Sequence, residues 1–332
     1  MLLQDLSEEE ILDRILPLLH PGGPGGAIVG PGDDAAVVTA PEPMVVTTDS
    51  MIRARDWRDD WSSAGDVAVK LGAQNISDIA AMGGVATGAV LTITADPLTS
   101  IDWVESFATG LGQWCAAAGV EVVGGDLSSA PPGVLQVSLT MWGSLEGRSP
   151  VLRSGARPGD IVAVCGSLGW SDAGLASYLA GDPDPERGPE VPMADRKLDS
   201  WRWFHRSPRP PWEAGPVAAA AGASAMIDLS DGLVRDAGRV ATASGVRIDL
   251  DRAALEADFV GVLADVVPAD QAWRHVLGGG EEHSLLATFP DAASVPRSEQ
   301  APWWIIGRVT EGAGVTLDGE PVEVVGWDHF RR

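Results

Sequence analysis

Basic residues, cysteines and long apolar runs are all scarce in this 332-residue sequence. Only 23 lysines and arginines stand against 47 aspartates and glutamates, so the formal net charge is −24. Nucleic acids and anionic membranes require basic surfaces, and we therefore expect neither as a partner. The acidity alone can serve solubility, whereas an acidic protein that binds an anion needs a cation to offset its own field.

The shortage of cysteine and lysine excludes further classes of site. Cys115 and Cys165 are the only cysteines, too few for a disulfide framework or a cysteine metal cage, and we expect both to be reduced. Lysine occurs only at Lys70 and Lys197, and neither follows a glycine-rich loop, which excludes a P-loop. The first 20 residues are acidic, unlike a signal peptide, and no run approaches 18 apolar residues, so we expect a cytoplasmic location.

The rest of the sequence alternates between segments typical of helices and segments typical of strands. Helices are predicted over residues 6–19, 63–82, 101–118, 171–179 and 231–244. Strands are predicted over residues 36–38, 44–48, 86–94, 120–123, 134–143, 161–165, 225–229, 246–250, 284–289 and 303–309. This alternation predicts a mixed α/β fold with α+β character. A turn-rich passage at 147–159 predicts two domains, 1–150 and 151–332, and the proline-rich stretch 181–216 is predicted to be a long loop or excursion.

Aspartates recur beside short apolar or glycine-containing segments, several of them where a strand is predicted to end. They are Asp33, Asp34, Asp49, Asp78, Asp126, Asp228 and Asp231. A carboxylate at the end of a buried strand is costly to leave unpaired, and several together repel unless a cation lies among them. Carboxylates suit Mg²⁺, which also takes phosphate oxygens as ligands. Any one of these aspartates could instead shape a turn or cap a helix, but their recurrence favours a metal site.

Glycines beside the acidic residues point to the approach of a ligand. The glycines at 124 and 125, next to Asp126, would let backbone N–H groups reach phosphate oxygens. The glycine run at 278–280 either admits a ligand that Glu281 faces or forms a plain turn. Asn75 and Asp78 share one face of the helix predicted over 63–82, so both could point into one site.

In their order along the chain, these motifs resemble those of thiamine-monophosphate kinases, within the aminoimidazole ribonucleotide synthetase-like superfamily. The matching segments are residues 32–37, 47–49, 75–84, 124–126, 154–160, 227–233 and 279–281. The resemblance implies a two-domain fold, with an N-terminal domain that forms a dimeric β-barrel and a C-terminal α/β domain that completes the active site. It also implies a homodimer that uses ATP to convert thiamine monophosphate into thiamine diphosphate by direct in-line transfer assisted by several Mg²⁺ ions.

The resemblance assigns roles to individual positions. The implied Mg²⁺ ligands are Asp34, Thr47, Thr48, Asp49, Asp78, Asp126, Asp228 and Asp231. The implied ATP contacts are Gly125, Asp126, Arg153 and Ser230, and the implied contacts of the thiamine substrate are Asp56, Glu281 and Trp327. Asp126, Arg153 and Asp231 are the implied catalytic residues. The attacking phosphate oxygen is already anionic near neutral pH, so no strong general base is expected.

Three departures from the family pattern concern the acceptor end of the site. They are Asp56, Leu127 and the pair Glu282 and His283. Two alternatives stay open from the residues: another ATP-dependent enzyme of the superfamily with a different acceptor, or a catalytically silent metal-binding scaffold. The lack of a reactive cysteine near the N-terminus and of a C-terminal cysteine disfavours the selenophosphate synthetase and hydrogenase maturation branches.

Overall fold

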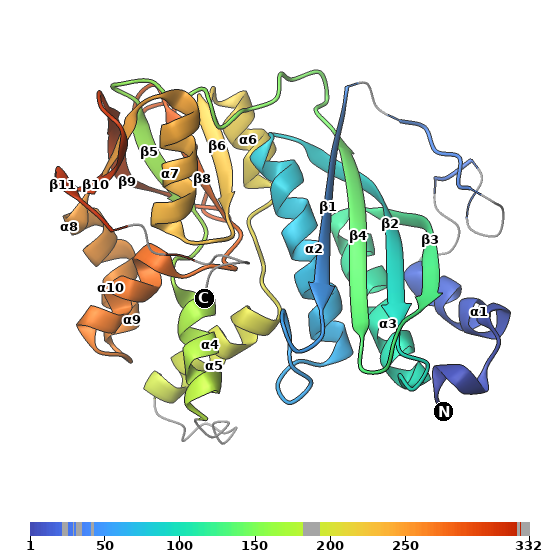
Figure 1. Ribbon diagram of the computed structural model, residues 1–332. Coiled ribbons are helices and arrows are strands. Elements are labelled where there is room, and N and C mark those ends of the chain that lie inside the picture. The colour runs from blue at the N-terminus through green and yellow to red at the C-terminus, as the bar shows by residue number, and fades with distance from the viewer. Residues whose placement is uncertain are drawn as a thin grey trace. The chain divides into compact units, whose positions relative to one another are not determined.

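The computed structural model describes residues 1–21, 26–28, 30, 35–40, 43–181, 193–323 and 326, with the backbone alone for 193–196 (Figure 1). The chain divides into two compact units. Unit 1 comprises Met1–Ile79 and Gly84–Gly147, and unit 2 comprises Ala80–Gly83 and Arg148–Arg332. The expectation of a mixed α/β fold is confirmed in both units. Among the described residues, no helix combines the length and the apolarity needed to cross a bilayer.

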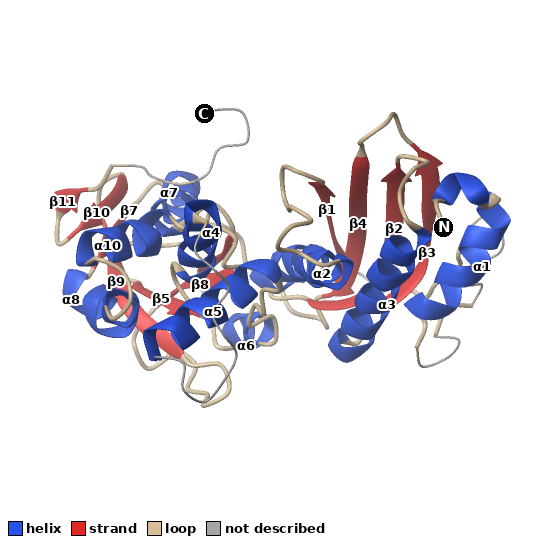
Figure 2. Cartoon of the chain, turned by 90° about the horizontal axis from the view of Figure 1, so that it is seen from below, coloured by secondary structure: helices blue, strands red, loops and turns tan. Residues whose placement is uncertain are grey.

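Unit 1 is a four-stranded sheet with helices on one face. The strand order is β1 (Met44–Ile52), β4 (Leu135–Ser144), β2 (Val85–Ala95) and β3 (Glu121–Ser129). Strands β2 and β3 are parallel and are joined by helix α3 (Ile101–Ala118), whereas β4 runs antiparallel to both of its neighbours. Figure 2 shows α3 and α2 (Ala64–Ala81) on the same face of this sheet. Alternate residues of β4 are buried against that face, so the opposite face is open to solvent or to a partner.

Local sequence signals explain where the outer helices of unit 1 begin and how they pack. Helix α1 (Glu8–Leu19), which follows a short 3₁₀ turn η1 (Leu3–Asp5), starts at Ser7, whose hydroxyl accepts from the Glu10 N–H in a capping box. Its apolar side packs on α3, where Gly112 is required because a Cβ there would overlap the Leu18 carbonyl. These features confirm the helices predicted over 6–19 and 101–118.

Unit 2 is built on a seven-stranded mixed sheet. The strand order is β11 (Glu320–Pro321), β10 (Gly314–Leu317), β7 (Arg247–Leu250), β9 (Trp303–Thr310), β5 (Ile161–Cys165), β8 (Ser284–Phe289) and β6 (Ala225–Leu229). The helices are α4 (Trp170–Ala180), α5 (Met193–Arg206), α6 (Ala214–Ala220), α7 (Leu233–Ser244), α8 (Arg252–Leu255), α9 (Gly261–Ala264) and α10 (Ala269–Gly278), with a π-helical turn η2 (Glu256–Val260) between α8 and α9.

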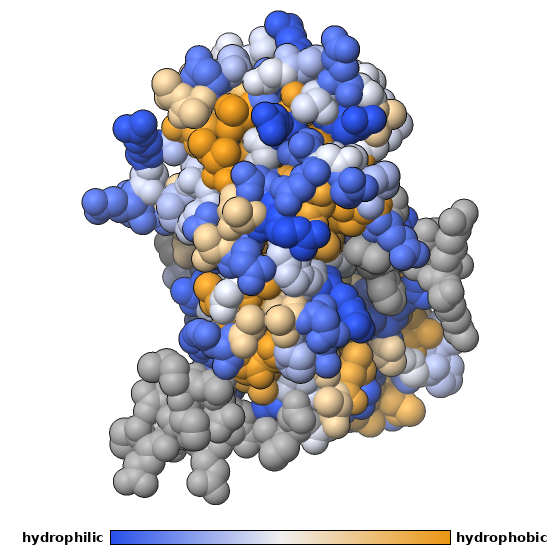
Figure 3. Space-filling view, turned by 90° about the vertical axis from the view of Figure 1, so that its left-hand side faces the viewer, coloured by the Kyte–Doolittle hydropathy of each residue, from blue (hydrophilic) through white to orange (hydrophobic). Residues whose placement is uncertain are grey.

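The central strands of unit 2 are buried on both faces. Val162 and Val164 face a core that includes residues of α4, α7 and α10, while Ala163 and Cys165 face a second core that includes α6. Covering on both faces explains why β5 is a continuous apolar run and why every residue of β6 and β8 is buried. On the face seen in Figure 3, by contrast, hydrophobic residues form small areas broken up by hydrophilic ones.

Several predicted boundaries were wrong for identifiable reasons. Asp49 and Asp126 do not end their strands: β1 continues to Ile52 and β3 to Ser129, because Asp49 pairs with Leu139 and Asp126 with Thr92. The stretch 181–216 is not a long loop, since it contains α5 and the start of α6; residues 182–192 lie outside the described part. The strand predicted over 36–38 is also absent, because only Val37 forms a bridge within residues 35–40.

Candidate functional site

In unit 1, one implied metal-ligand pair lies between β1 and α2. The Thr47 hydroxyl donates to Asp78 Oδ2 at 2.6 Å. Asn75, one turn earlier on α2, is fully buried, and its amide donates to the Leu71 carbonyl at 2.9 Å. The sequence pattern placed Asn75 and Asp78 on one face, but the Asn75 amide donates to a carbonyl of its own helix.

Strand alternation separates the other implied ligands of unit 1. Thr47 and Asp49 pair with Met141 and Leu139, whose side chains are buried beneath the helices. Thr48 lies on the open face, where its hydroxyl is 2.9 Å from that of Thr140.

Asp126 also belongs to the open face of the sheet. It pairs with Thr92, which in turn pairs with Ser138 on β4. The Ser128 hydroxyl, two residues along the same strand, donates to Asp126 Oδ2 at 2.7 Å. Two strands, β4 and β2, lie between β1 and β3, so Thr48 and Asp126 are on the same face but not adjacent.

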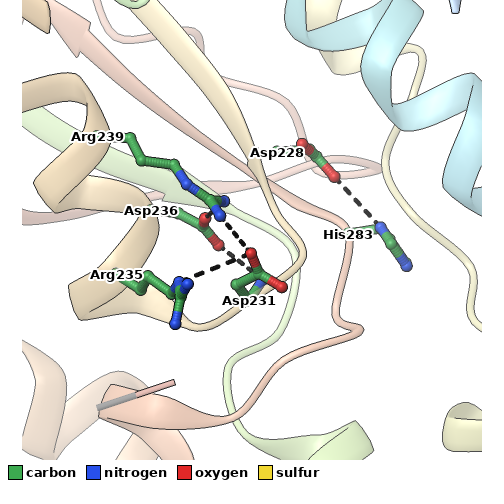
Figure 4. A network of polar contacts seen from close by, with 6 residues as sticks. All are labelled: Asp228, Asp231, Arg235, Asp236, Arg239 and His283. Carbon is green, nitrogen blue, oxygen red and sulfur yellow. Dashed lines mark hydrogen bonds and ion pairs between the residues drawn. The ribbon is translucent and has the colours of Figure 1, made fainter. Parts of the chain in front are cut away.

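In unit 2, Asp231 lies in a network of charged residues at the start of α7 (Figure 4). Arg239 bridges the carboxylates of Asp231 and Asp236, and Arg235 is 3.8 Å from Asp231 Oδ2. The backbone N–H of Asp231 donates to Asp236 Oδ2 at 2.9 Å. Asp231 is therefore not the N-cap of the helix, a position that Gly232 occupies. Arg239 was missed from the sequence, although its spacing of three residues from Asp236 on a helix was a usable signal.

Two buried aspartates of unit 2 contact polar groups that the sequence did not predict. Burial raises the pKa of Asp236 to about 6, an effect that the Asp231 N–H and Arg239 oppose. Asp228 is buried at the end of β6, and its Oδ2 lies 3.2 Å from Nδ1 of His283 (Figure 4). His283 comes from the loop before β8, so this loop meets the end of β6 at this pair.

In unit 2, the loop after β6 and the loop before β8 are joined along their backbones. The Glu281 N–H donates to the Ser230 carbonyl at 2.8 Å, and the His283 N–H donates to the Leu229 carbonyl at 2.9 Å. Gly280 is required here because a Cβ would lie 2.6 Å from the Ser230 carbonyl oxygen. Glu281 and His283 adopt φ values of +62° and +53°, so the loop is held in a conformation that side chains rarely adopt. Ser230, an implied ATP contact, and Glu281, an implied acceptor contact, thus lie in one bonded pair of loops.

The acids after the glycine run have different surroundings. Glu282 is fully buried and accepts from the Ser167 hydroxyl at 2.6 Å and from the Ser171 N–H at 2.7 Å. Burial raises the pKa of Glu282 to about 7, although both hydrogen bonds oppose that shift. Glu281 is partly exposed, and its Oε2 lies 3.4 Å from Nδ1 of His205 on α5.

The remaining implied residues lie apart from these networks or outside the described chain. Asp56 accepts from the Ile52 N–H at 2.7 Å and so shapes the turn after β1. The Arg153 carbonyl accepts from Ser244 at 2.8 Å, and Gly125 lies within β3. Asp34 and Trp327 fall outside the described residues. Across the described ranges, no group of three or more histidine, cysteine, aspartate or glutamate side chains is placed to hold one metal ion.

Comparisons with known proteins identify the family. The N-terminal domain model of AIR synthase related proteins matches residues 32–145, and the C-terminal domain model matches residues 157–320. The thiamine-monophosphate kinase of Mycobacterium tuberculosis strain ATCC 25618 / H37Rv is 41% identical over 332 residues, which cover 99% of this chain and 93% of that protein. The chain belongs to the thiamine-monophosphate kinase family.

Solved structures of the thiamine-monophosphate kinase family share the whole fold. The enzyme from Stenotrophomonas maltophilia K279a matches with a TM-score of 0.80 at 29% identity, over 95% of this chain and 98% of that one. AaThiL complexed with AMPPCP and TMP matches with a TM-score of 0.74 at 28% identity, over 99% of each chain. The resemblance inferred from the ordered motifs is thereby confirmed, together with the two-domain fold of mixed α/β content. The roles of individual residues remain predictions.

Proposed function

We propose that this chain transfers the γ-phosphoryl group of ATP to thiamine monophosphate, forming ADP and thiamine diphosphate. The observation that carries the proposal is the full-length match to a thiamine-monophosphate kinase at 41% identity. The structure adds that Ser230 and Glu281, which the resemblance assigns to ATP and to the acceptor, lie in loops bonded to each other. Such an arrangement suits an enzyme that transfers a group between two substrates, because holding both reactants together lowers the activation barrier.

The oxygen donors in both units fit the Mg²⁺ that the family implies. Thr47, Asp78 and Asp126 in unit 1, and Asp228 and Asp231 in unit 2, offer the hard carboxylate and hydroxyl ligands that this ion prefers. Mg²⁺ uses one or two protein carboxylates and completes its shell with water and phosphate oxygens, so clusters of three acids are not needed. When bound, Mg²⁺ supplies positive charge that offsets the repulsion between two polyanionic substrates.

The chain's own residues provide orientation and fixed charge. Arg239 holds Asp231 toward α7, which fixes the direction of one implied metal ligand. We assign Arg153 and Gly125 to ATP and Asp56 and Trp327 to the thiamine substrate, as the family motifs indicate. The acceptor phosphate oxygen is anionic near neutral pH, so the transfer proceeds directly, without a phosphorylated enzyme.

We further propose that unit 1 dimerises through its open sheet face, so that two sheets close into a shared β-barrel. Met44, Val46 and Ile52 on β1 and Val85 on β2 are exposed large apolar residues on that face. No helix among the described residues of unit 1 covers it (Figure 2). In the homodimer that the family resemblance implies, the same sheet of a second copy packs on this face. On this proposal, residues 1–150 bind ATP and Mg²⁺ and form the dimer, and residues 151–332 complete the site, in a cytoplasmic enzyme.

The direct test is turnover with defined substrates. Purified protein is incubated with ATP, Mg²⁺ and thiamine monophosphate, and thiamine diphosphate and ADP are quantified by chromatography. We expect the two products in equal amounts. Consumption of ATP only with a different acceptor would favour another enzyme of the superfamily, and absence of ATP binding would favour a scaffold.

A matched pair of variants tests the metal-binding role of Asp126. Asp126→Asn keeps the side-chain shape but removes a charged ligand, and we expect kcat to fall by at least about a hundredfold with an unchanged melting temperature. Asp102→Asn, which alters an exposed acid on α3 of the same unit, should leave kcat unchanged. Near-normal turnover of Asp126→Asn would remove Asp126 from the metal site.

A further inference from the structure

The side chain of Glu281 is close to a histidine that belongs to a different part of unit 2. His205 lies in the last turn of α5 and is buried, with a relative exposure of 5%. Its Nδ1 is 3.4 Å from Glu281 Oε2 and 3.0 Å from the Ser171 hydroxyl on α4. Nδ1 therefore faces both oxygens. The Glu281 side chain itself is 32% exposed, so its carboxylate is still accessible to a ligand.

The backbone around Glu281 is fixed independently of His205. Its N–H is bonded to Ser230, and the next residue, Glu282, is anchored in the interior by Ser167 and Ser171. With the backbone held, the direction of the carboxylate depends on the rotatable bonds of the glutamate side chain. A contact at the carboxylate end, as His205 makes, restricts those bonds in a way that the loop backbone cannot.

Helix α5 is well placed to hold His205 rigidly. It packs along α4, and the buried Arg202, one turn before His205, donates to the Ser177 hydroxyl on α4 at 2.9 Å. Ser171 joins the two parts of the network, because its N–H donates to Glu282 and its hydroxyl contacts His205. The N-terminal turn of α4 thus supports both the backbone and the side chain of the acceptor loop.

We propose that His205 is a positioning residue that holds the Glu281 carboxylate in place for the acceptor, an inference that rests on the proposed function. Thiamine monophosphate carries a cationic thiazolium ring and an aminopyrimidine with N–H donors, and a carboxylate attracts both kinds of group. Holding the carboxylate before binding removes part of the entropy cost of ordering it in the complex. Helix α5 thus supports the acceptor end of the proposed site, although the sequence did not predict a helix there.

The test compares KM for the two substrates in variants at His205. His205→Ala should raise KM for thiamine monophosphate by about tenfold while KM for ATP stays within about twofold, because the contact that orients the Glu281 carboxylate is lost. His205→Asn places an amide N–H near the position of Nδ1 and should return KM for the acceptor to within about threefold of the wild type. A purely structural role of His205 would not produce this split or this rescue.

His275→Ala is the matched control. His275 is a second buried imidazole of unit 2 that also contacts α4 through Nδ1, but its partner is Asp172, at 2.6 Å. We expect this variant to lose thermal stability and to keep the wild-type KM for the acceptor. An unchanged acceptor KM in His205→Ala, or an equal rise in both variants, would overturn the role of His205. Absence of thiamine diphosphate formation by the wild type would contradict the proposed function itself.

Discussion

Three consecutive side chains after the glycine run contact three different parts of unit 2. They belong to Glu281, Glu282 and His283. Glu281 reaches His205 and stays partly exposed, Glu282 is buried against α4, and His283 contacts Asp228 at the end of β6. The two departures from the family pattern at 282 and 283 thus have partners inside unit 2. The residues at 282 and 283 anchor the loop, whereas Glu281 is the position that the resemblance assigns to the acceptor.

Glu282 predicts a pH dependence of stability that can be measured directly. Burial raises its pKa from 4.5 to about 7, so between these values the folded protein keeps a proton that the unfolded chain has lost. Stability therefore falls as pH rises through this window. At about 1.4 kcal/mol per unit, the loss reaches at most about 3.5 kcal/mol. Glu282→Gln should remove this component of the pH dependence, as measured by urea unfolding from pH 4.5 to pH 8.

The control for this measurement is an exposed glutamate of the same unit. Glu299→Gln lies on the surface and should give a stability curve parallel to that of the wild type. If the stability of Glu282→Gln changes with pH as that of the wild type does across this window, the pKa of Glu282 is not raised.

At the scale of elements, the signals at helix ends were the most informative part of the sequence. The helix predicted over 101–118 was confirmed at both ends, because Ser100 caps its start and Gly119 adopts the left-handed conformation after it. The helices α8 and α9 were missed because each has only four residues and shows no periodicity over a full window. The ten-residue helix α10 was missed as well. Strand β3 was predicted to end at 123, whereas it continues through Gly125, where a Cβ would overlap the Leu91 carbonyl of β2.

The joined loops of unit 2 predict a steric effect at Gly280. In Gly280→Ala the new Cβ would lie 2.6 Å from the Ser230 carbonyl oxygen, and the two loops must separate to accommodate it. We expect a loss of roughly 1–3 kcal/mol in unfolding free energy and a loss of turnover, since the contacts to both substrates shift. Thermal and urea unfolding together with the kinase assay provide the measurements.

Gly238→Ala serves as the comparison, because the added Cβ on α7 meets nothing closer than 3.9 Å. Alanine has the higher helix propensity, so this variant should be as stable as the wild type or more so. Equal behaviour of Gly280→Ala and Gly238→Ala would show that the two loops are not held together as described.

At the scale of the whole molecule, the sequence predicted the family of the chain but not how its acidic residues are arranged. The ordered motifs placed the chain in its family, and that placement is confirmed. The motifs suggested one set of metal ligands, whereas in unit 1 the strand alternation sends Thr47 and Asp49 to the helical face and Thr48 and Asp126 to the open face. Consecutive residues in a strand face opposite ways, but which strands pair, and in which register, depends on contacts between distant segments.

The open face of unit 1 leads to a prediction about assembly. Val46 lies in the middle of β1 with 53% of its surface exposed, and Val46→Lys would place a charge in the proposed dimer interface. We expect the variant to sediment as a monomer at micromolar concentration, where the wild type sediments as a dimer, because an unpaired charge is costly to bury. Leu179→Lys is the control, since it adds the same charge to an exposed leucine on α4 of unit 2 and should leave the dimer intact. A monomeric wild type, or a dimeric Val46→Lys variant of unchanged stability, would contradict dimerisation through this face.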